Sequence, residues 1–401
     1  MRVALAVGGI SYLKIFGSLI KESHRFGIEP IILYWHPEKD SKIYENITGD
    51  ALLRTFPELS TEQLHEFDPA NIKDVLIRTN CQAVLFLSAY KQYCDQLSEI
   101  EEHNISTWRL EHFVNSIYET AKTEYGADVD MAMKHLTGKF VATDFWKNLE
   151  FKIKPELSAV ADKYYIVGNL VADVYRYIEP ENARRILNIK SNEKIITFFA
   201  PNIRKHHSYY VWGWRSQKKL ETLLKELRNY CDEFGYKLVI KSRRKQWDNP
   251  LYKEYADHFF TDVVSAAYPH ASALLLSLSE LMVHMGSMAV LEAAAVNVPS
   301  LGVGVSSIDK LHGYMSKRAR QIIKKDLFGE EEGCPFSFKG VSEQISVNRI
   351  KKDLPERCDS LINLRVKNMN KMLDYKSKFI GTSRLSADRI WEEIKKHHAS
   401  S

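Results

Sequence analysis

The sequence predicts an α/β protein with two halves, each built around a parallel sheet. An apolar run at residues 2–7 is followed by a glycine pair and an amphipathic segment. The same order of strand, turn and helix begins again at residue 194 and once more at residue 281. Continuous apolar runs of this length are typical of parallel strands that are buried on both faces. Two such series in one chain predict two doubly wound domains.

The first half opens with a complete βαβ unit, which indicates a Rossmann-like domain. Residues 2–7 form the first predicted strand, and Gly8 and Gly9 form the turn after it. Apolar residues then share one face of a predicted helix: Ile15, Phe16, Leu19, Ile20 and Phe26. Gly27 is suited to end this helix, and residues 31–34 form the next strand. The glycine pair lacks the spacing of a dinucleotide site, and such a turn is equally suited to an acceptor substrate.

Further strands and a polar segment complete the first half. Residues 83–87 and 163–169 continue the strand pattern, and residues 104–154 are rich in aromatic and charged side chains. Residues 179–192 are charged and polar, and we expect Pro180 to break any helix there. The domain boundary is therefore placed near residue 185. The resulting division has a first domain at 1–185, a second at 186–385, and a helix at 386–401 for which we expect packing towards the first domain.

The second half repeats the α/β order. Residues 194–199 form a strand, and residues 200–207 form the loop at its carboxyl end. A helix follows, with apolar residues at helical spacing and Gly235 at its end: Leu220, Leu223, Leu224, Leu227, Cys231 and Phe234. Residues 238–240 form the next strand, and residues 268–278 look helical.

The stretch from residue 280 to residue 304 is the most informative part of the chain. Residues 281–285 read as a strand, and Gly286 and Ser287 as a turn that opens an alanine-rich helix. Asn297 ends this helix, and a second strand follows. A helix N-terminus beyond a parallel strand presents unpaired N–H groups and a partial positive charge, which suits a phosphate. Strand–glycine–helix turns also occur in α/β proteins without a ligand there. Glu292 lies in an otherwise apolar helix, so its carboxylate needs a partner or a ligand.

Residues suited to phosphate follow three strands of the second half. In doubly wound sheets, ligands bind beyond the carboxyl ends of the strands. If these strands are neighbours, one edge of the sheet brings together the following residues: Asn202, Arg204, Lys241, Arg243, Arg244, Gly286 and Ser287. A solvated turn is the alternative reading for Arg243 and Arg244, as it is for the neighbouring His206 and His207.

Composition excludes several other classes of protein. The 401 residues include 45% hydrophobic and 27% charged residues, with a net charge of +5. This balance is typical of a globular protein, and the charge is too small to indicate nucleic-acid binding. The five scattered cysteines indicate reduced thiols in a cytosolic protein. No signal peptide or membrane span is visible. The Asp128–Val–Asp130 pattern precedes a helical segment, where carboxylates complement the helix dipole, so we expect no metal.

The second half resembles a known family of enzymes. Two Rossmann-like domains that face each other across a cleft are similar to the GT-B fold of nucleotide-sugar glycosyltransferases, and of surface and capsular polysaccharide transferases in particular. The motifs that carry this likeness are Val283-His-Met-Gly-Ser287, Leu291-Glu-Ala293 and Val298-Pro-Ser-Leu301. The segments Tyr165-Ile-Val-Gly-Asn169, Phe199-Ala-Pro-Asn202 and Val239-Ile-Lys241 also resemble CDP-glycerol glycerophosphotransferases. The likeness covers roughly residues 160–310. It departs from those relatives at Ser242-Arg-Arg244, where they often have His-Pro, and at His284, where retaining members often have glutamate.

The resemblance implies a metal-independent glycosyltransferase that uses a nucleotide sugar as co-substrate, with no other cofactor. Its donor-binding residues would be Asn202, Arg204, Lys241, Arg243, Arg244, His284, Gly286, Ser287, Met288 and Glu292. Gly8 and Gly9 would lie on the acceptor side. An inverting enzyme needs a base from the first half, for which His36 and Asp144 are the candidates, beside Glu111 and His112.

Two other functions stay open from the sequence. One is an epimerase of the UDP-N-acetylglucosamine 2-epimerase type, or a CDP-glycerol-type phosphotransferase. The other is a two-lobed nucleotide- or sugar-binding protein without catalysis. The expected partners are a nucleotide-sugar donor and a glycan or lipid-linked acceptor, without nucleic acid. We expect a cytoplasmic location, with weak peripheral membrane contact through residues 317–320 or 324–325 as one option and a solvated helix face as the other.

Overall fold

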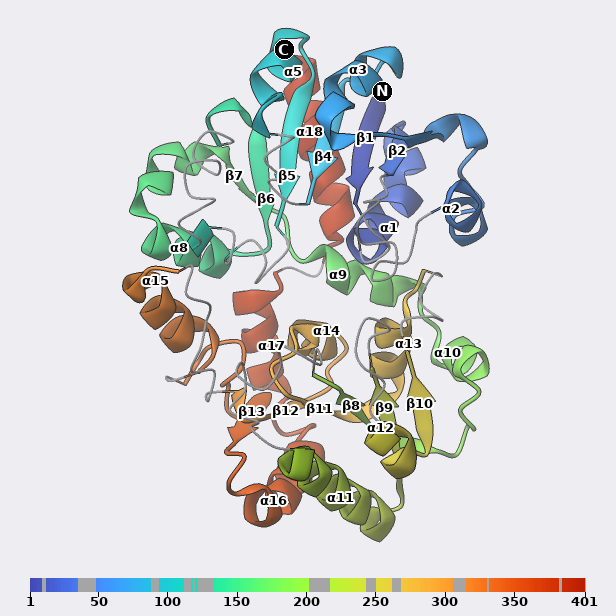
Figure 1. Ribbon diagram of the computed structural model, residues 1–401, viewed down its shortest axis with the longest axis vertical. Helices are drawn as coiled ribbons and strands as arrows, with labels where there is room; N and C mark the ends of the chain where they lie inside the picture. Colours follow the sequence, from blue (N-terminus) through green and yellow to red (C-terminus); the bar gives the residue numbers. More distant parts are fainter. Residues whose placement is uncertain are drawn as a thin grey trace. The chain divides into compact units, whose positions relative to one another are not determined.

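The computed structural model divides the chain into two compact units (Figure 1). The first unit contains Met1–Val174 and returns at Gly381–Ser401, and the second contains Tyr175–Ser265 and Pro269–Ile380. The structure describes residues 1–8, 12–34, 48–87, 94–111, 117, 120–121, 133–201, 217–242, 250–261, 268–305, 315–329, 332–381 and 384–400.

The first unit contains a seven-stranded parallel sheet in the order β3-β2-β1-β4-β5-β6-β7. Its strands are β1 (Arg2–Val7), β2 (Glu29–Tyr34), β3 (Leu64–Glu66), β4 (Ala83–Phe86), β5 (Ser106–Leu110), β6 (Gly138–Val141) and β7 (Tyr164–Ile166). Its helices are α1 (Leu13–Glu22), α2 (Gly49–Thr55), α3 (Ile72–Arg78), α5 (Leu97–Glu102), α8 (Asp144–Ile153), α9 (Leu170–Asp173) and α18 (Ser386–Ser400).

Both faces of the first sheet are covered by helices. Ala4 and Ala6 of β1 pack with apolar residues of α3 and α5. Helices α1 and α18 pack against each other, and Trp391 of α18 is fully buried and donates its indole N–H to the Leu19 carbonyl at 3.1 Å. The last helix of the chain is therefore part of the first unit.

The second unit contains a six-stranded parallel sheet in the order β10-β9-β8-β11-β12-β13. Its strands are β8 (Lys194–Phe199), β9 (Tyr236–Lys241), β10 (His258–Phe260), β11 (Ser279–His284), β12 (Ser300–Val303) and β13 (Ser342–Ile345). Its helices are α10 (Pro180–Leu187), α11 (Gln217–Phe234), α12 (Pro250–Tyr255), α13 (Ala271–Leu278), α14 (Ala289–Ala295), α15 (Lys317–Ile322), α16 (Ile350–Asn363) and α17 (Met369–Phe379).

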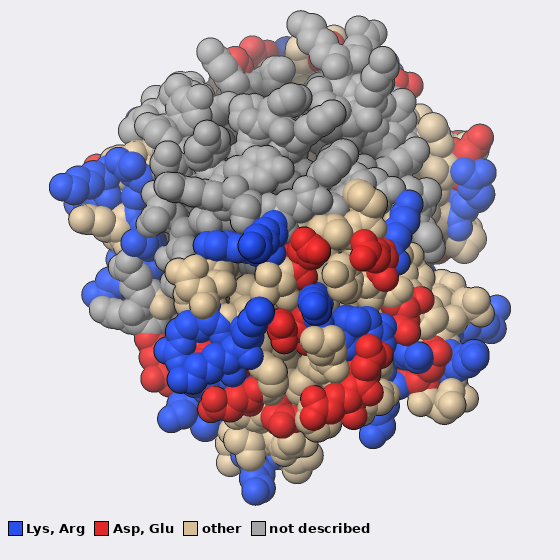
Figure 2. All heavy atoms as spheres, turned by 60° about the horizontal axis from the view of Figure 1, so that its bottom comes forward, with Lys and Arg blue, Asp and Glu red and all other residues tan. Residues whose placement is uncertain are grey.

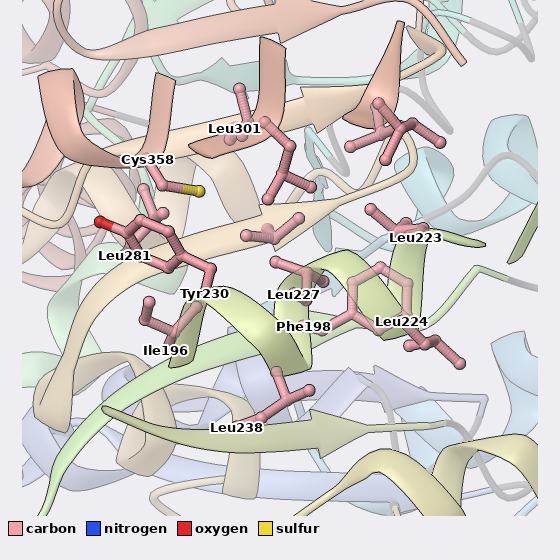
Figure 3. Packing of buried hydrophobic residues seen from close by; sticks show 14 of the residues in the cluster. Ile196, Phe198, Leu223, Leu224, Leu227, Tyr230, Leu238, Leu281, Leu301 and Cys358 are labelled. Carbon is pink, nitrogen blue, oxygen red and sulfur yellow. The ribbon is translucent and has the colours of Figure 1, made fainter. Parts of the chain in front are cut away.

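Two helix layers enclose the second sheet as well. Helices α11 and α16 lie on one side of the strands, and α13 and α14 lie on the other (Figure 1). Figure 3 shows how Leu223, Leu224 and Leu227 of α11 meet strand residues such as Ile196 and Leu281. The helical spacing of these leucines in the sequence is therefore the apolar face that covers the sheet.

Most predicted elements are confirmed, and one expectation is wrong. The predicted strands at 2–7 and 194–199 are β1 and β8, and the helix that ends at Gly235 is α11. Pro180 does not break a helix, because it occupies the first turn of α10. A first-turn proline loses no hydrogen bond, since the N–H at that position has no partner within the helix. The sequence-based boundary near residue 185 falls inside this helix.

Candidate functional site

The strand order of the second sheet reverses between β8 and β11. From β8 the chain runs outward through β9 and β10, and it then returns to the other side of β8 as β11. Ligands of doubly wound sheets bind beyond the carboxyl ends of the strands at such a reversal. In register, Phe199 of β8 is paired with His284 of β11, and each residue is the last of its strand. The predicted donor motif therefore begins at the place where this architecture binds ligands.

A single row of residues crosses the carboxyl edge of this sheet. Lys241, Phe199, His284, Gly302 and Gln344 are register partners from β9 to β13. Register partners on parallel strands point to the same face. Lys241 and His284, both predicted as donor-binding residues, are therefore brought to one face of one sheet edge, with Phe199 between them.

His284 is fully buried and holds the turn that follows it. Its Nδ1 accepts hydrogen bonds from the Gly286 N–H at 2.9 Å and from the Ser287 N–H at 3.3 Å. Since Nδ1 accepts, the ring proton is assigned to Nε2. Burial lowers the pKa of His284 to about 3, so the ring stays neutral at ordinary pH. The buried Nε2 has no hydrogen-bond partner among the described residues.

The Gly286–Ser287 turn is therefore built around an imidazole. Gly286 has a φ of 86°, which glycine adopts without strain. The Ser287 hydroxyl accepts from the Ala289 N–H at 3.3 Å, and Met288 precedes the first residue of α14. Both amides that the sequence assigns to phosphate thus donate inward to His284. Phosphate binding by these amides stays a prediction, and it requires them to be shared between the imidazole and the phosphate.

Glu292 has the partner that its place in an apolar helix requires. The Glu292 Oε2 lies 3.0 Å from Nε2 of His270, the buried residue that precedes α13. The Glu292 side chain is 13% exposed, against 3% for His270. The Tyr175 phenol lies near this pair, and burial, followed by the Glu292 carboxylate, raises its pKa. A carboxylate, an imidazole and a phenol together offer acceptors and donors for hydroxyl groups.

Lys241 is a buried lysine at the carboxyl end of β9. Its side chain is 5% exposed, and Nζ lies 6.0 Å from the centre of the Phe199 ring. The neighbouring Ser242 is also buried. A lysine in this position supplies a point charge to an anion at the sheet edge.

The other predicted site residues lie elsewhere or beyond the described part of the chain. Asp144 begins α8, is 70% exposed, and pairs with Lys147 at 2.9 Å. Gly8 follows β1, where a Cβ would lie 3.3 Å from the Tyr12 ring. The predicted residues that lie outside the described ranges are Gly9, His36, His112, Asn202, Arg204, His206, His207, Arg243 and Arg244, together with the Asp128–Asp130 pattern.

The first unit contains a buried charged cluster at the ends of β5 and β6. Lys139 and Glu150 form an ion pair that is almost fully buried, and the Tyr164 hydroxyl donates to Glu150 at 3.0 Å. Burial lowers the pKa of Lys139, opposed by the Glu150 carboxylate. Arg109 of β5 is 1% exposed and belongs to the same cluster. Buried charges of this kind are retained only when they are paired.

Glu111 completes this cluster and borders a small cavity. Its Oε2 accepts the Ala142 N–H at 2.9 Å, and its buried Oε1 has no partner among the described residues. The cavity, of about 20 Å³, is lined by Glu111, Ala142 and Asn169 among others, and this is enough for a water molecule. Burial, together with Glu150, raises the pKa of Glu111 to about 8. Burial therefore favours the protonated form of this carboxyl well above the pH at which a free glutamate ionises.

Several of these residues were not singled out from the sequence. His270 and Tyr175 lie 22 and more than one hundred positions from Glu292 in the chain, and neither belongs to a local motif. His270 precedes the apolar run of α13, and a polar residue in that position is the only sequence signal it gave. The Lys139–Glu150 pair joins β6 to α8, and it could be found only from the tertiary structure.

Within the described ranges, the structure offers neither a candidate metal site nor a helix suited to span a membrane. No group of three or more His, Cys, Asp or Glu side chains in the described ranges is placed to hold a metal ion. Among the described helices, none has both the length and the apolar character needed to cross a bilayer. All five cysteines are free and buried.

Solved structures identify the fold. UDP-GlcNAc 2-epimerase from Neisseria meningitidis, bound to UDP-GlcNAc, matches 99% of this chain and 100% of its own, with a TM-score of 0.58 and 12% identity. UDP-GlcNAc 2-epimerase from Methanocaldococcus jannaschii matches 99% of this chain and 100% of its own, with a TM-score of 0.59 and 12% identity. The wall teichoic acid polymerase TagF matches 100% of this chain and 89% of its own, with a TM-score of 0.59 and 11% identity. The chain has a GT-B fold.

These matches span both units of the chain. The predicted fold class, an α/β protein with two Rossmann-like domains, is confirmed. No protein-family model matches the sequence, and no curated protein matches it either. At 11% to 12% identity, the likeness to these enzymes is a likeness of fold. Function must be argued from the site.

Proposed function

We propose that the protein is a metal-independent glycosyltransferase that moves a sugar from a nucleotide-sugar donor to a glycan or other surface-polysaccharide acceptor. The observation that carries this proposal is the carboxyl edge of the second sheet. There, Lys241, His284 and the Gly286–Ser287 turn share the point where the strand order reverses. The likeness to enzymes whose structures contain UDP or UDP-GlcNAc supports a nucleotide-sugar ligand.

The second unit would bind the donor. The leaving nucleoside phosphate gains negative charge in the transition state, and a preorganised cation stabilises that charge. Lys241 is suited to this role because its burial keeps the cation in a low-dielectric site. The Glu292–His270 pair would accept and donate hydrogen bonds to ribose or sugar hydroxyls. In this proposal His284 acts through the turn that it holds.

Among the described residues of the first unit, Glu111 is a candidate for proton transfer. A general base works best when its pKa lies near the working pH, and the pKa of Glu111 is about 8. Asp144, which the sequence proposed for this role together with His36, is an exposed helix-start carboxylate paired with Lys147. We therefore prefer Glu111 among the described carboxylates. Replacement by glutamine should reduce turnover while leaving donor affinity within about twofold.

An epimerase is the second candidate function. The observation that favours it is coverage, because the two 2-epimerases match over 100% of their own length, whereas TagF matches over 89%. An epimerase would use the same donor site and an acid–base residue such as Glu111, without an acceptor. A nucleotide- or sugar-binding protein without catalysis would show neither reaction.

Donor binding is tested with a lysine at each end of the second sheet. We expect Lys241→Met to weaken the binding of nucleoside diphosphates by about 1.5–3 kcal/mol, the usual value of a charged hydrogen bond. Lys194→Met is the matched control, since Lys194 is exposed at the amino end of β8. Affinities come from isothermal titration, after a thermal-shift screen of CMP-, UDP-, GDP- and CDP-linked sugars. Equal affinities for both variants and the original chain would refute the assignment of Lys241.

The reaction is tested by following two products of one incubation. A transferase releases the nucleoside phosphate only when a glycan acceptor is present, whereas an epimerase changes the sugar without an acceptor. Nuclear magnetic resonance of the screened donor distinguishes these outcomes. Donor binding without either product would favour the non-catalytic alternative.

A further inference from the structure

The end of the second unit carries an unusual concentration of exposed apolar side chains. Of the large hydrophobic residues that are exposed in the described part of the chain, four lie within ten positions of the sequence. Their exposed fractions are 37% for Leu364, 82% for Val366, 39% for Met369 and 57% for Leu373. The other three, Ile77, Ile186 and Phe234, are scattered. Single exposed apolar residues need no explanation, but a cluster indicates a contact surface.

Three of these four side chains share one helical face. The turn between α16 and α17 continues helical hydrogen bonding, because the Asn368 N–H donates to the Leu364 carbonyl at 2.8 Å and the Met372 N–H to the Asn368 carbonyl at 3.0 Å. Positions 366, 369 and 373 have the i, i+3, i+7 spacing of one face. On the adjacent face of α17, Met372, Tyr375 and Phe379 are buried. The segment is thus anchored in the unit by one face and presents a second apolar face outward.

Positive charge accompanies this outward apolar face. Between residues 364 and 373 the chain contains Arg365, Lys367 and Lys371, and the exposed Asp374 follows directly after Leu373. Arg365 pairs with Glu280 at 3.0 Å, whereas no ion pair among the described residues involves Lys367 or Lys371. Both lysines are exposed. On the face drawn in Figure 2, Lys and Arg are interspersed with Asp and Glu over the part that the structure describes.

We infer that Val366, Met369 and Leu373, with Lys367 and Lys371 beside them, form a surface that docks on an anionic lipid bilayer. Apolar side chains in such a surface enter the boundary between headgroups and acyl chains, and lysines pair with anionic headgroups. Lysine also keeps its stem against apolar surface while its ammonium remains in water. A second copy of this chain fits less well, because a twofold contact would bring the same lysines together. The inference does not depend on the proposed enzymatic activity.

This surface differs from the basic segment that the sequence proposed for membrane contact. Residues 317–325 contribute no large exposed hydrophobic residue to the described part of the chain. Charge alone attracts a protein weakly and is screened by salt. The combination of apolar and basic side chains at 364–373 therefore provides the stronger basis for membrane binding.

The experiment measures co-sedimentation of the full chain with vesicles. One set contains phosphatidylglycerol and phosphatidylcholine in equal parts, and the other contains phosphatidylcholine alone. We expect binding to the anionic set and at least tenfold weaker binding to the neutral set. Val366→Ser combined with Leu373→Ser should weaken binding to anionic vesicles at least tenfold. Lys367→Gln combined with Lys371→Gln should weaken it by roughly fivefold per charge at low salt.

Matched control variants distinguish binding through this surface from nonspecific binding to vesicles. Ile186→Ser removes a comparably exposed side chain, and Lys351→Gln with Lys352→Gln removes two exposed charges from the start of α16. These variants should bind vesicles as the original chain does. Circular dichroism and thermal melting verify that each variant is folded. The inference would be overturned if the full chain did not bind anionic vesicles, or if the control variants lost binding equally. It would also be overturned if replacement of Lys317 and Arg320 alone abolished binding, or if the full chain self-associated and the Val366/Leu373 variant did not.

Discussion

At the residue scale, the candidate donor site depends on a glycine that makes room for a histidine. Gly302 of β12 is the register partner of His284. A Cβ at Gly302 would lie 3.2 Å from Cε1 of His284 and 2.8 Å from Cγ2 of Val305. A side chain at residue 302 would therefore crowd Val305 and the imidazole that accepts the amides of the turn. The two residues act as one structural unit.

The first expectation concerns this pair. Gly302→Ala should destabilise the protein by about 1–3 kcal/mol, the usual cost of adding a group to a packed core. It should also weaken nucleotide binding, because displacement of His284 loosens the Gly286–Ser287 turn. Gly49→Ala is the control, since its Cβ would make an ordinary contact of 3.6 Å with Leu64. Urea denaturation measures the stability of the Gly302→Ala and Gly49→Ala variants. Equal stability of the two would show that the space at residue 302 is not needed by His284.

The pH dependence of stability should report the buried Glu111. Burial and the neighbouring Glu150 raise its pKa from 4.5 to about 8. Between these values the unfolded chain has lost the proton, whereas the folded chain retains it. The folded state then binds more protons, so stability falls as the pH rises through this range. Below about pH 4.5 both states are protonated, and the contribution is fully present.

The Glu111→Gln variant tests whether Glu111 makes stability fall as the pH rises. The variant keeps an oxygen for the Ala142 N–H but cannot ionise, so its stability should fall less steeply between about pH 5 and pH 8. Glu62→Gln, at an exposed position, controls for the loss of one carboxylate. Urea midpoints across the range provide the comparison. Parallel slopes for Glu111→Gln and the original chain would show that Glu111 does not titrate within it.

The sequence indicated which residues of the second unit matter but not how they are connected. Glu292 could be singled out because a carboxylate in an apolar helix requires a partner, yet the partner His270 precedes a different helix. His284 could be placed at the end of a strand, but its bonds to two amides depend on the geometry of the turn. The local sequence pattern thus identifies which side chains are chemically important, and the tertiary contacts of those side chains decide what each one does.

At the element scale, helices with regular apolar spacing were predictable, and those fixed by distant contacts were not. The leucine pattern of α11 was sufficient because one apolar face covers a sheet. In α10 a proline misled the prediction, because its effect depends on whether it occupies the first turn or the interior of a helix. Helix α18 begins near the predicted residue, but the residue that caps it, Asp173, lies more than two hundred positions earlier.

This long-range cap gives an expectation at the element scale. The Asp173 carboxylate accepts the N–H groups of Ser386 at 3.0 Å and Ala387 at 2.9 Å, and it is 6% exposed. Asp173→Ala leaves both buried donors without this partner, which should cost about 1–3 kcal/mol. Asp173→Asn should cost less, because an amide oxygen still accepts. Urea denaturation compares the stability of the original chain, the Asp173→Asn variant and the Asp173→Ala variant. If the asparagine variant were as unstable as the alanine variant, Asp173 would not act as a helix cap.

At the scale of the whole molecule, the two units share a strand order but differ in how their ends are completed. Both sheets run outward from a central strand and then return to its other side. The first unit is completed by α18 from the end of the chain, after the second unit has been traversed. The core of the first unit therefore includes residues that follow the second unit in the sequence. The sequence led us to expect that the helix at 386–401 packs towards the first domain, and the tertiary contacts identify its partners, such as the Leu19 carbonyl that accepts the Trp391 N–H.

Removal of α18 should therefore destabilise one unit selectively. Truncation after Leu385 deletes Ile390, Trp391 and Ile394, all fully buried. Since loss of a single buried tryptophan side chain costs about 3–5 kcal/mol, the first unit should lose most of its stability. Hydrogen exchange should then be fast in β1 and remain slow in β8, and Trp391→Ala should reproduce the pattern more weakly. Equal acceleration in both sheets would mean that the units unfold together, and unchanged exchange in β1 would mean that α18 is dispensable for the first core.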